Sequence, residues 1–305
     1  MTAVSVLMPV YNADRFVKQA IRSILCQTFS DFELLILDDG STDGSLEIVR
    51  SFAAQDDRIK YWSRANRGLV ISLNEMLDGA IGTFIARMDA DDISEPRRLE
   101  LQIQAFRSTP HLLAVGSDIV FIDSAERRLM KVMMPRGHEE IDTWTMAVSR
   151  GTGMSHPTMM LRAEAFKLAG PYRSEFWPAE DADLVLRVAE KGQLANLPLA
   201  LLRYRVHEDS IGHTQSVQQR DAHYRAAVAA ALRRGSPPPD EKLRVLPRET
   251  INSIETAAAR DTKWAWWALN DGNVRTARLL ALRAVLKGPL ERATWLVLAC
   301  ALRGR

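Results

Sequence analysis

The chain has few of the features that would place it in several large classes of protein. Its 305 residues include two cysteines, Cys26 and Cys300, which are too far apart in the sequence to indicate a disulfide framework or a metal knuckle. The formal net charge is +2, so we expect no nucleic-acid partner. The longest apolar-rich stretch, residues 293–302, is too short to span a bilayer. These features favour a globular protein of a reducing compartment, and we expect a cytoplasmic location.

Two glycine-rich nucleotide-binding loops are also missing. The first apolar run, residues 4–10, leads into Tyr11 and Asn12 instead of a G-x-G-x-x-G turn, which argues against a dinucleotide-dependent oxidoreductase. The sequence contains no Walker A lysine loop. The N-terminal residues lack a basic segment ahead of an apolar core, so we expect a first strand there and not a signal peptide.

Short apolar runs alternate with helical stripes along most of the chain. Strands are expected at residues 4–10, 32–37, 59–62, 83–88, 112–122, 158–161 and 197–206. Helical patterns lie between the first of these strands, whereas residues 131–144 are expected to be irregular. This alternation predicts βαβ units and an α/β fold with a mostly parallel sheet flanked by helices. Right-handed crossovers then bring the carboxyl ends of the strands to one edge.

Three carboxylates come directly after the strand expected at residues 83–88. Asp89, Asp91 and Asp92 would repel one another unless a cation or a hydrogen-bond network lies among them. Hard oxygen ligands suit Mg²⁺ or Mn²⁺, and the carboxyl edge of an α/β sheet is where ligands bind. The alternative is a solvated acidic turn. Ser94 is expected to cap the next helix, with Pro96 near its first position.

Composition changes near residue 215, and most of the chain beyond that point is expected to be helical. We therefore expect a catalytic domain at residues 1–215 and a C-terminal helical region at residues 216–305. Trp264, Trp266 and Trp267 share one expected helix, and their simplest role is packing between antiparallel helices. A membrane-surface helix near residues 290–302, or a homo-oligomer formed through these helices, are the alternatives.

Six short motifs occur in a characteristic order. They are SVLMPVYN at residues 5–12, DDGSTD at 38–43, ARMDADD at 86–92, SHPT at 155–158, EDADL at 180–184 and YRVH at 204–207. In this order and spacing the chain resembles the family 2 glycosyltransferases of the GT-A fold. The resemblance covers residues 1–210 and implies a GT-A-like sheet, with a Rossmann-like nucleotide-binding half, an acceptor half and a C-terminal helical appendage.

The resemblance also implies roles for individual residues. Asp39 would accept a hydrogen bond from a uracil-like base, and Tyr11 would pack against that base. The implied donor-binding residues are Pro9, Tyr11, Asn12, Asp39, Arg87, Asp89, Ala90 and Asp91. The implied ligands of Mn²⁺ or Mg²⁺ are Asp91, Asp92 and His207, and which of the three central acids binds the metal directly stays open. Arg98 is a further candidate for an anion contact, with a surface or salt-bridge role as the alternative.

The implied activity is the inverting transfer of a hexose from a nucleoside diphosphate sugar, UDP-linked by preference. Asp181, at the start of an expected helix, would be the general base, with Glu180 orienting it and Asp183 exposed. The acceptor would be a glycan or a lipid-linked saccharide in bacterial polysaccharide or cell-surface glycan synthesis. Such an acceptor places the protein in the cytoplasm, peripheral to the inner membrane face. A non-catalytic nucleotide-sugar-binding protein with the same fold is the alternative.

Overall fold

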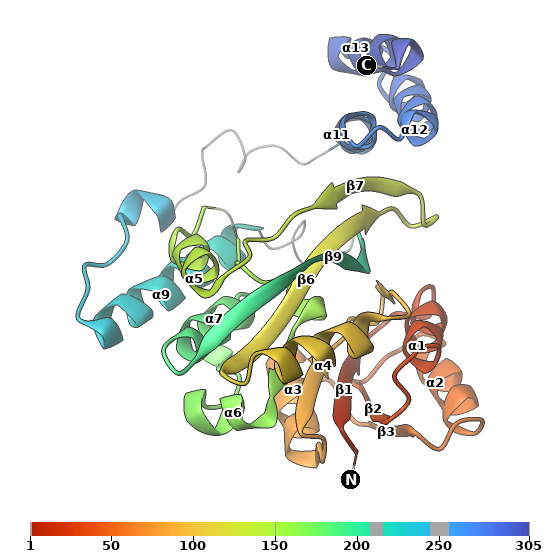
Figure 1. Ribbon diagram of the computed structural model, residues 1–305. Coiled ribbons are helices and arrows are strands. Elements are labelled where there is room, and N and C mark those ends of the chain that lie inside the picture. Colours follow the sequence, from red (N-terminus) through yellow and green to blue (C-terminus); the bar gives the residue numbers. More distant parts are fainter. Residues whose placement is uncertain (1, 150, 208–215, 245–255, 305) are drawn as a thin grey trace. The chain divides into compact units, whose positions relative to one another are not determined.

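A computed structural model describes residues 2–149, 151–207, 216–244 and 256–304 (Figure 1). The chain forms two compact units. The first unit comprises Met1–Ile119, Met133–Arg203 and Ile211–Val245. The second unit comprises Val120–Val132, Tyr204–Ser210 and Leu246–Arg305.

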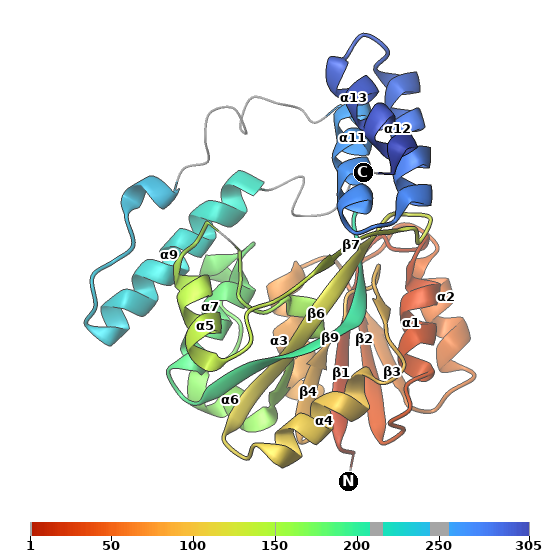
Figure 2. The ribbon, with the colours of Figure 1, turned by 45° about the horizontal axis from the view of Figure 1, so that its top comes forward.

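The parallel half of the sheet lies in the first unit and contains four adjacent strands. They are β3 (Ile59–Ser63), β2 (Phe32–Asp38), β1 (Val4–Val10) and β4 (Phe84–Arg87), all paired in parallel (Figure 2). Val10 pairs with Asp38, and Leu7 with Arg87, so the three strands β1, β2 and β4 end at the same edge. The expected convergence of these strand ends is therefore confirmed.

Helices cover both faces of this half because each has an apolar stripe. They are α1 (Val17–Leu25), α2 (Ser45–Ala53) and α3 (Leu69–Gly79). On α3 the buried residues Val70, Leu73 and Met76 pack in one core with Leu7 of β1 and Leu35 of β2. The strands β1 and β2 are buried along their whole length, as expected for parallel strands between helices.

The remaining strands pair differently. In the part of the chain that the structure describes, the sheet has nine strands in the order β3-β2-β1-β4-β8-β6-β9-β5, and β7 pairs with β6. The added strands are β8 (Met160–Arg162), β6 (Leu112–Ile122), β9 (Gln193–Arg205), β5 (Ile93–Ser94) and β7 (Arg128–Val132). β8 is antiparallel to both β4 and β6, and β5 is antiparallel to β9. The α/β class is confirmed, with a sheet that is mixed because its second half is not built from βαβ units.

Two local expectations are wrong. Ser94 does not cap a helix but pairs in β5 with Leu202, and α4 (Arg98–Ser108) begins after it. Residues 131–144 are not irregular, because they contain the end of β7 and most of α5 (His138–Met146). Both errors concern short elements that are fixed by pairing with distant parts of the chain.

The first unit also contains several further helices. They are η1 (His156–Thr158), α6 (Ala163–Ala169), η2 (Ser174–Phe176), α7 (Glu180–Ala189), α9 (Ser216–Arg234) and η3 (Glu241–Arg244). Helix α9 packs on α7, where Ala222 meets Ala179 and Ala182. These small side chains let the two helices approach closely near the N-terminus of α7.

The second unit is built on three helices, α11 (Ala257–Asn270), α12 (Val274–Lys287) and α13 (Arg292–Arg303). The three helices contact one another, and Trp264 of α11 is buried in their core with Leu280 and Val297. The expected packing role of Trp264 is therefore confirmed. In the described parts of the chain, no helix combines the length and the apolar character needed to cross a membrane.

Candidate active site

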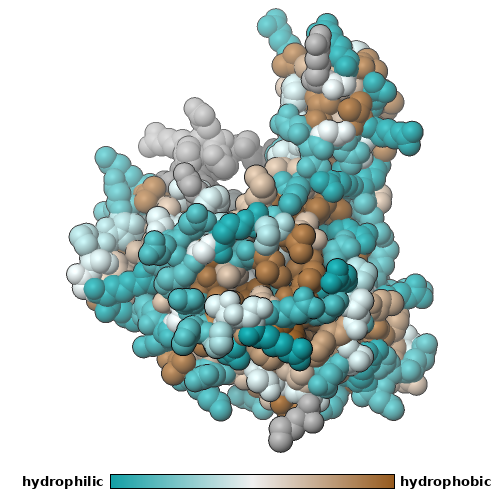
Figure 3. Space-filling model, viewed as in Figure 1, coloured by the Kyte–Doolittle hydropathy of each residue, from teal (hydrophilic) through white to brown (hydrophobic). Residues whose placement is uncertain are grey.

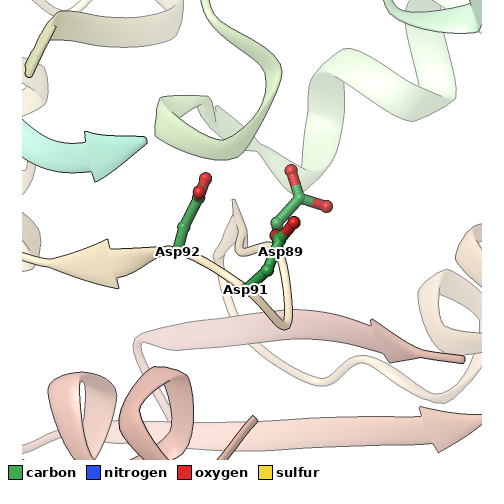
Figure 4. A group of neighbouring side chains, drawn as sticks. All are labelled: Asp89, Asp91 and Asp92. Atoms are coloured by element: carbon green, nitrogen blue, oxygen red, sulfur yellow. The ribbon is translucent and has the colours of Figure 1, made fainter. Parts of the chain in front are cut away.

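The three central acids occupy the turn that joins β4 to β5. The end of β4 is fixed on both sides, since the Arg87 N–H donates to the Met159 carbonyl at 2.8 Å and the Met88 N–H to the Leu7 carbonyl at 3.0 Å. One carboxylate oxygen from each of Asp89, Asp91 and Asp92 lies within 4.8 Å of the others, and the three side chains extend to the same side of the turn (Figure 4). The turn therefore gathers three negative charges at the carboxyl edge of the sheet.

This donor set fits a divalent cation. Carboxylate oxygens are the ligands that Mg²⁺ and Mn²⁺ prefer. Burial raises the pKa of Asp89; the Arg87 guanidinium opposes this shift, and the charges of Asp91 and Asp181 add to it. Asp92 is buried, whereas Asp89 and Asp91 are partly exposed and can be reached from outside. A bound cation would offset the repulsion among the three acids.

Two buried arginines lie behind the acid turn. Arg98 is completely buried, and its Nη2 donates to the Arg87 carbonyl at 2.6 Å while its Nε donates to Gln102 Oε1 at 3.2 Å. Burial lowers the pKa of Arg98 to about 9, against the attraction of Asp92. At neutral pH the group stays charged and holds the end of β4, so Arg98 is a structural residue and not a surface one.

Arg87 retains unused hydrogen-bonding capacity. Its Nη2 donates to Asp89 Oδ1 at 2.6 Å. Its Nε and Nη1 are buried, and neither has a hydrogen-bond partner in the described parts of the chain. A guanidinium presents five N–H donors, so a buried one with idle donors suits an anionic or hydroxyl-rich ligand.

The loop after β1 lies beside the loop after β2. The Asn12 N–H donates to Ser41 Oγ at 3.0 Å, and Asn12 Oδ1 accepts from the Thr42 N–H at 2.8 Å. The Tyr11 side chain is exposed, with its ring available for stacking, whereas Pro9 is buried within β1. Ala90 is buried in the acid turn. The sequence therefore predicted correctly that these loops meet at the carboxyl edge of the sheet. Pro9 and Ala90 are buried there, so they shape the backbone and offer little surface to a ligand.

Asp39 organises the loop that precedes α3. Its Oδ1 accepts from the Arg67 N–H at 2.9 Å and from the Arg64 guanidinium, and its Oδ2 accepts from the Gly68 N–H at 2.8 Å. A carboxylate offers about four acceptor positions, so about one remains for a ligand. Asp38 accepts from Ser63 Oγ at 2.7 Å and is structural.

Asp181 lies in the first turn of α7 and is partly exposed. Its Oδ2 accepts from Thr152 Oγ1 at 3.0 Å, and its Oδ1 accepts from the Ala182 N–H at 2.8 Å. Burial raises the pKa of Asp181, while His223 on α9 and the Thr152 hydroxyl oppose the shift. Burial lowers the pKa of His223 itself. Because the charge of Asp181 also raises the pKa of Asp89, the two carboxylates are within electrostatic reach of each other.

The neighbouring acids of α7 have other environments. Asp183 is completely buried and bonded to the guanidinium groups of Arg173 and Arg187, so the expectation that it is exposed is wrong. Glu180 is buried, and burial together with the charge of Asp181 raises the pKa of Glu180 to about 8. At neutral pH Glu180 is therefore mostly protonated. Of these three acids, Asp181 is the one that combines partial exposure with free acceptor positions.

A neutral polar pair lies beside Arg87. His156 Nε2 is 3.0 Å from the Tyr172 hydroxyl, and both side chains are well shielded from solvent. Burial and the charge of Arg87 lower the pKa of His156 well below its ordinary range, so the ring is uncharged at neutral pH. Sequence reasoning missed Thr152, Tyr172 and His223, since only their contacts identify them. His207 belongs to the second unit, and its assignment as a metal ligand stays a prediction.

Residues 5–167 match the family model of glycosyl transferase family 2. The putative glycosyltransferase EpsE of Bacillus subtilis is 39% identical over 212 residues, which cover 68% of this chain and 73% of that protein. Among solved structures, S. aureus TarS in complex with UDP-GlcNAc has a TM-score of 0.60 at 17% identity, covering 99% of this chain and 92% of that one. The mannosyltransferase PcManGT from Pyrobaculum calidifontis, in complex with GDP-Man and Mn²⁺, has a TM-score of 0.58 at 20% identity, covering 99% and 85%.

The two structures share the fold of this chain, and the resemblance inferred from six motifs is confirmed. The match of the family model over more than half of the sequence, together with the likeness to EpsE, decides the assignment. The chain belongs to glycosyl transferase family 2, and it is a glycosyltransferase.

Proposed function

We propose that the protein transfers a hexose, with inversion, from a nucleoside diphosphate sugar to a hydroxyl group of a glycan or lipid-linked saccharide. The observation that carries this proposal is the acid turn, where one carboxylate oxygen from each of Asp89, Asp91 and Asp92 lies within 4.8 Å of the others. The turn suits a metal and a diphosphate, and Asp181 adds a partly exposed carboxylate that can take a proton. A pyrophosphate site and a general base are the two elements that such a transfer needs.

The donor would lie along the carboxyl edge of β1, β2 and β4. Tyr11 offers an exposed ring for the base, and Asp39 offers its remaining acceptor position. Asn12 shapes the loop between them. The idle Nε and Nη1 donors of Arg87 suit a phosphate or sugar oxygen. We propose a uracil base, because a single carboxylate acceptor matches the one ring N–H of uracil.

Asp91 and Asp92 are the proposed metal ligands, with Asp89 beside them. Bound Mn²⁺ or Mg²⁺ would supply positive charge to the leaving diphosphate. The mannosyltransferase PcManGT, which was solved with GDP-Man and Mn²⁺, supports a metal in a protein of this fold. TarS, solved with UDP-GlcNAc, supports a nucleotide-sugar donor. His207 is the proposed third ligand.

Asp181 is the proposed general base. The acceptor oxygen forms a bond to the anomeric carbon as the bond from that carbon to the diphosphate oxygen breaks. The acceptor proton passes to a carboxylate oxygen of Asp181, and the nucleoside diphosphate leaves. One direct displacement inverts the anomeric configuration. The positive end of α7 and the Thr152 hydroxyl favour the ionised form that this role requires.

We propose that residues 1–215 carry this chemistry and that residues 216–305 are a mainly helical region. Within that region α9 packs on α7 in the first unit, and α11, α12 and α13 belong to the second unit. A bacterial polysaccharide or cell-surface glycan pathway in the cytoplasm is the proposed setting. The non-catalytic alternative is disfavoured because Asp39, Asp91 and Asp181 are all in place.

Calorimetry with UDP, GDP and dTDP, each with and without Mn²⁺, tests the donor site. We expect UDP to bind most tightly and only weakly after chelation. Asp91→Asn should lose the effect of Mn²⁺, whereas the exposed control Asp57→Asn should keep it. Equal affinities for all three nucleotides, unaffected by metal, would contradict both the uracil and the metal assignments.

A further inference from the structure

Helix α12 presents an exposed row of leucines. Leu279, Leu282 and Leu286 are between 42% and 74% exposed. Their spacing of three and four residues places them on one face of a helix with about 3.6 residues per turn. The opposite face is buried against the other two helices through Leu280 and Ala284. The row is therefore additional to the apolar stripe that α12 needs for folding.

The apolar surface continues into the turn after α12 and into α13. Leu290 in that turn is 97% exposed. The Trp295 Nε1–H donates to the Pro289 carbonyl at 2.8 Å, which anchors an exposed indole beside Leu290. Leu296 is also exposed. Figure 3 shows hydrophobic residues gathered among hydrophilic ones on the face of the second unit that it displays.

The sequence around this row is mostly basic. From residue 274 to residue 305, the sequence has seven lysines and arginines and a single acid, Glu291. Arg275 continues the line of the leucine row at helical spacing. Arg278 and Arg283 flank the row, but Arg278 donates to the carbonyls of Ala301 and Leu302, and Arg283 lies 3.4 Å from Asp261 of α11. Arg292 and Arg303 are exposed on α13. Long basic side chains can extend to phosphate groups while neighbouring leucines enter an apolar layer.

We infer that the leucine row of α12, with the Leu290–Trp295 turn, docks flat on an anionic lipid surface. Apolar residues bordered by basic ones are the pattern of an interfacial helix. A second copy of the chain is a poorer occupant, because a two-fold contact would bring two basic surfaces together. The inference goes beyond the transferase reaction and does not depend on it, since none of these residues belongs to the acid turn or to α7.

Flotation of the full chain with vesicles tests the inference. We expect binding to phosphatidylcholine vesicles that contain phosphatidylglycerol, little binding to phosphatidylcholine alone, and release by high salt. Leu286→Glu should reduce the partition coefficient about tenfold. The control Leu168→Glu changes a leucine of α6 that is 47% exposed and should leave binding unchanged. Arg275→Gln should weaken binding to anionic vesicles only.

Circular dichroism melts and donor-transfer assays establish that each variant is folded. A folded Leu286→Glu protein that binds anionic vesicles as well as the wild type would overturn the inference. Absence of wild-type binding to those vesicles would overturn it too. Mass photometry tests a third outcome, in which the wild-type chain is a dimer and Leu286→Glu is a monomer. That result would overturn the lipid assignment and would identify the leucine row as a contact between two copies of the chain.

Discussion

Replacing Asp181 by asparagine separates its proposed chemical role from its structural role. The asparagine Oδ1 can still accept from the Ala182 N–H, which lies 2.8 Å from the carboxylate. Its Nδ2 can donate to the hydroxyl oxygen of Thr152, which at present donates to Asp181 Oδ2 at 3.0 Å. Shape and both local hydrogen bonds are therefore preserved. Only the ability to take a proton is lost.

The expected magnitudes differ widely. Loss of a general base lowers turnover by roughly 10²–10⁴-fold, which corresponds to about 3–5 kcal/mol in the barrier. Asp181 lies inside the first turn of α7, after the N-cap residue Ala179, so its replacement by asparagine removes a charge–dipole interaction worth about 0.3–1 kcal/mol, and the melting temperature should change little. Because the acceptor proton moves to Asp181 only in the transition state, kcat and kcat/KM should fall together while donor affinity is retained.

The assay measures release of nucleoside diphosphate at saturating donor, together with thermal melting and donor calorimetry. Asp183→Asn is the structural comparison, since it leaves the buried Arg187 and the partly exposed Arg173 short of a partner and should cost about 3–5 kcal/mol of stability. Asp57→Asn is the neutral control. A folded Asp181→Asn protein with near-normal turnover would refute the assignment of the base.

Three further predictions concern the same site. Excess chelator should abolish transfer, and added Mn²⁺ or Mg²⁺ should restore it. Asp91→Asn should be folded but inactive even with added metal. Full activity in excess chelator would contradict the proposed role of a metal. Asp39→Asn should weaken UDP binding by about 1–3 kcal/mol, the cost of an unpaired donor on the base, as calorimetry would show; unchanged affinity in a folded variant would exclude Asp39 from the base site. Thr152→Val removes a hydroxyl that lowers the pKa of Asp181. Since the base acts when ionised, that pKa rises further and the acid limb of the pH–rate profile should move to higher pH; an unmoved limb would mean that another group controls it.

The sequence was most informative where structure depends on local periodicity and parallel pairing. The strand expected at residues 112–122 matches β6 at both ends. Tyr11, Asp39 and Asp89 were expected at one edge because parallel strands with right-handed crossovers end together, and the register of β1, β2 and β4 confirms the edge.

The sequence was least informative where contacts with residues far away in the sequence determine the local structure or the burial of a side chain. Ser94 and Pro96 carry the local signature of a helix start, yet pairing with β9 makes Ser94 part of a strand. Asp183 has the spacing of an exposed helical acid, but Arg173 and Arg187 hold it in the interior. No pattern in the sequence links His223 to Asp181, because a helix that comes after the whole sheet brings them together.

Mass spectrometry of the full chain incubated with Mn²⁺, a panel of UDP-, GDP- and dTDP-sugars and a set of saccharide acceptors tests the central claim most directly. The account predicts one glycosylated product with release of the matching nucleoside diphosphate, and an anomeric configuration inverted relative to the donor. A product with retained configuration would contradict the direct displacement. Tight donor binding without any transfer or release of nucleoside diphosphate, across the whole panel, would contradict the proposed donor and acceptor classes.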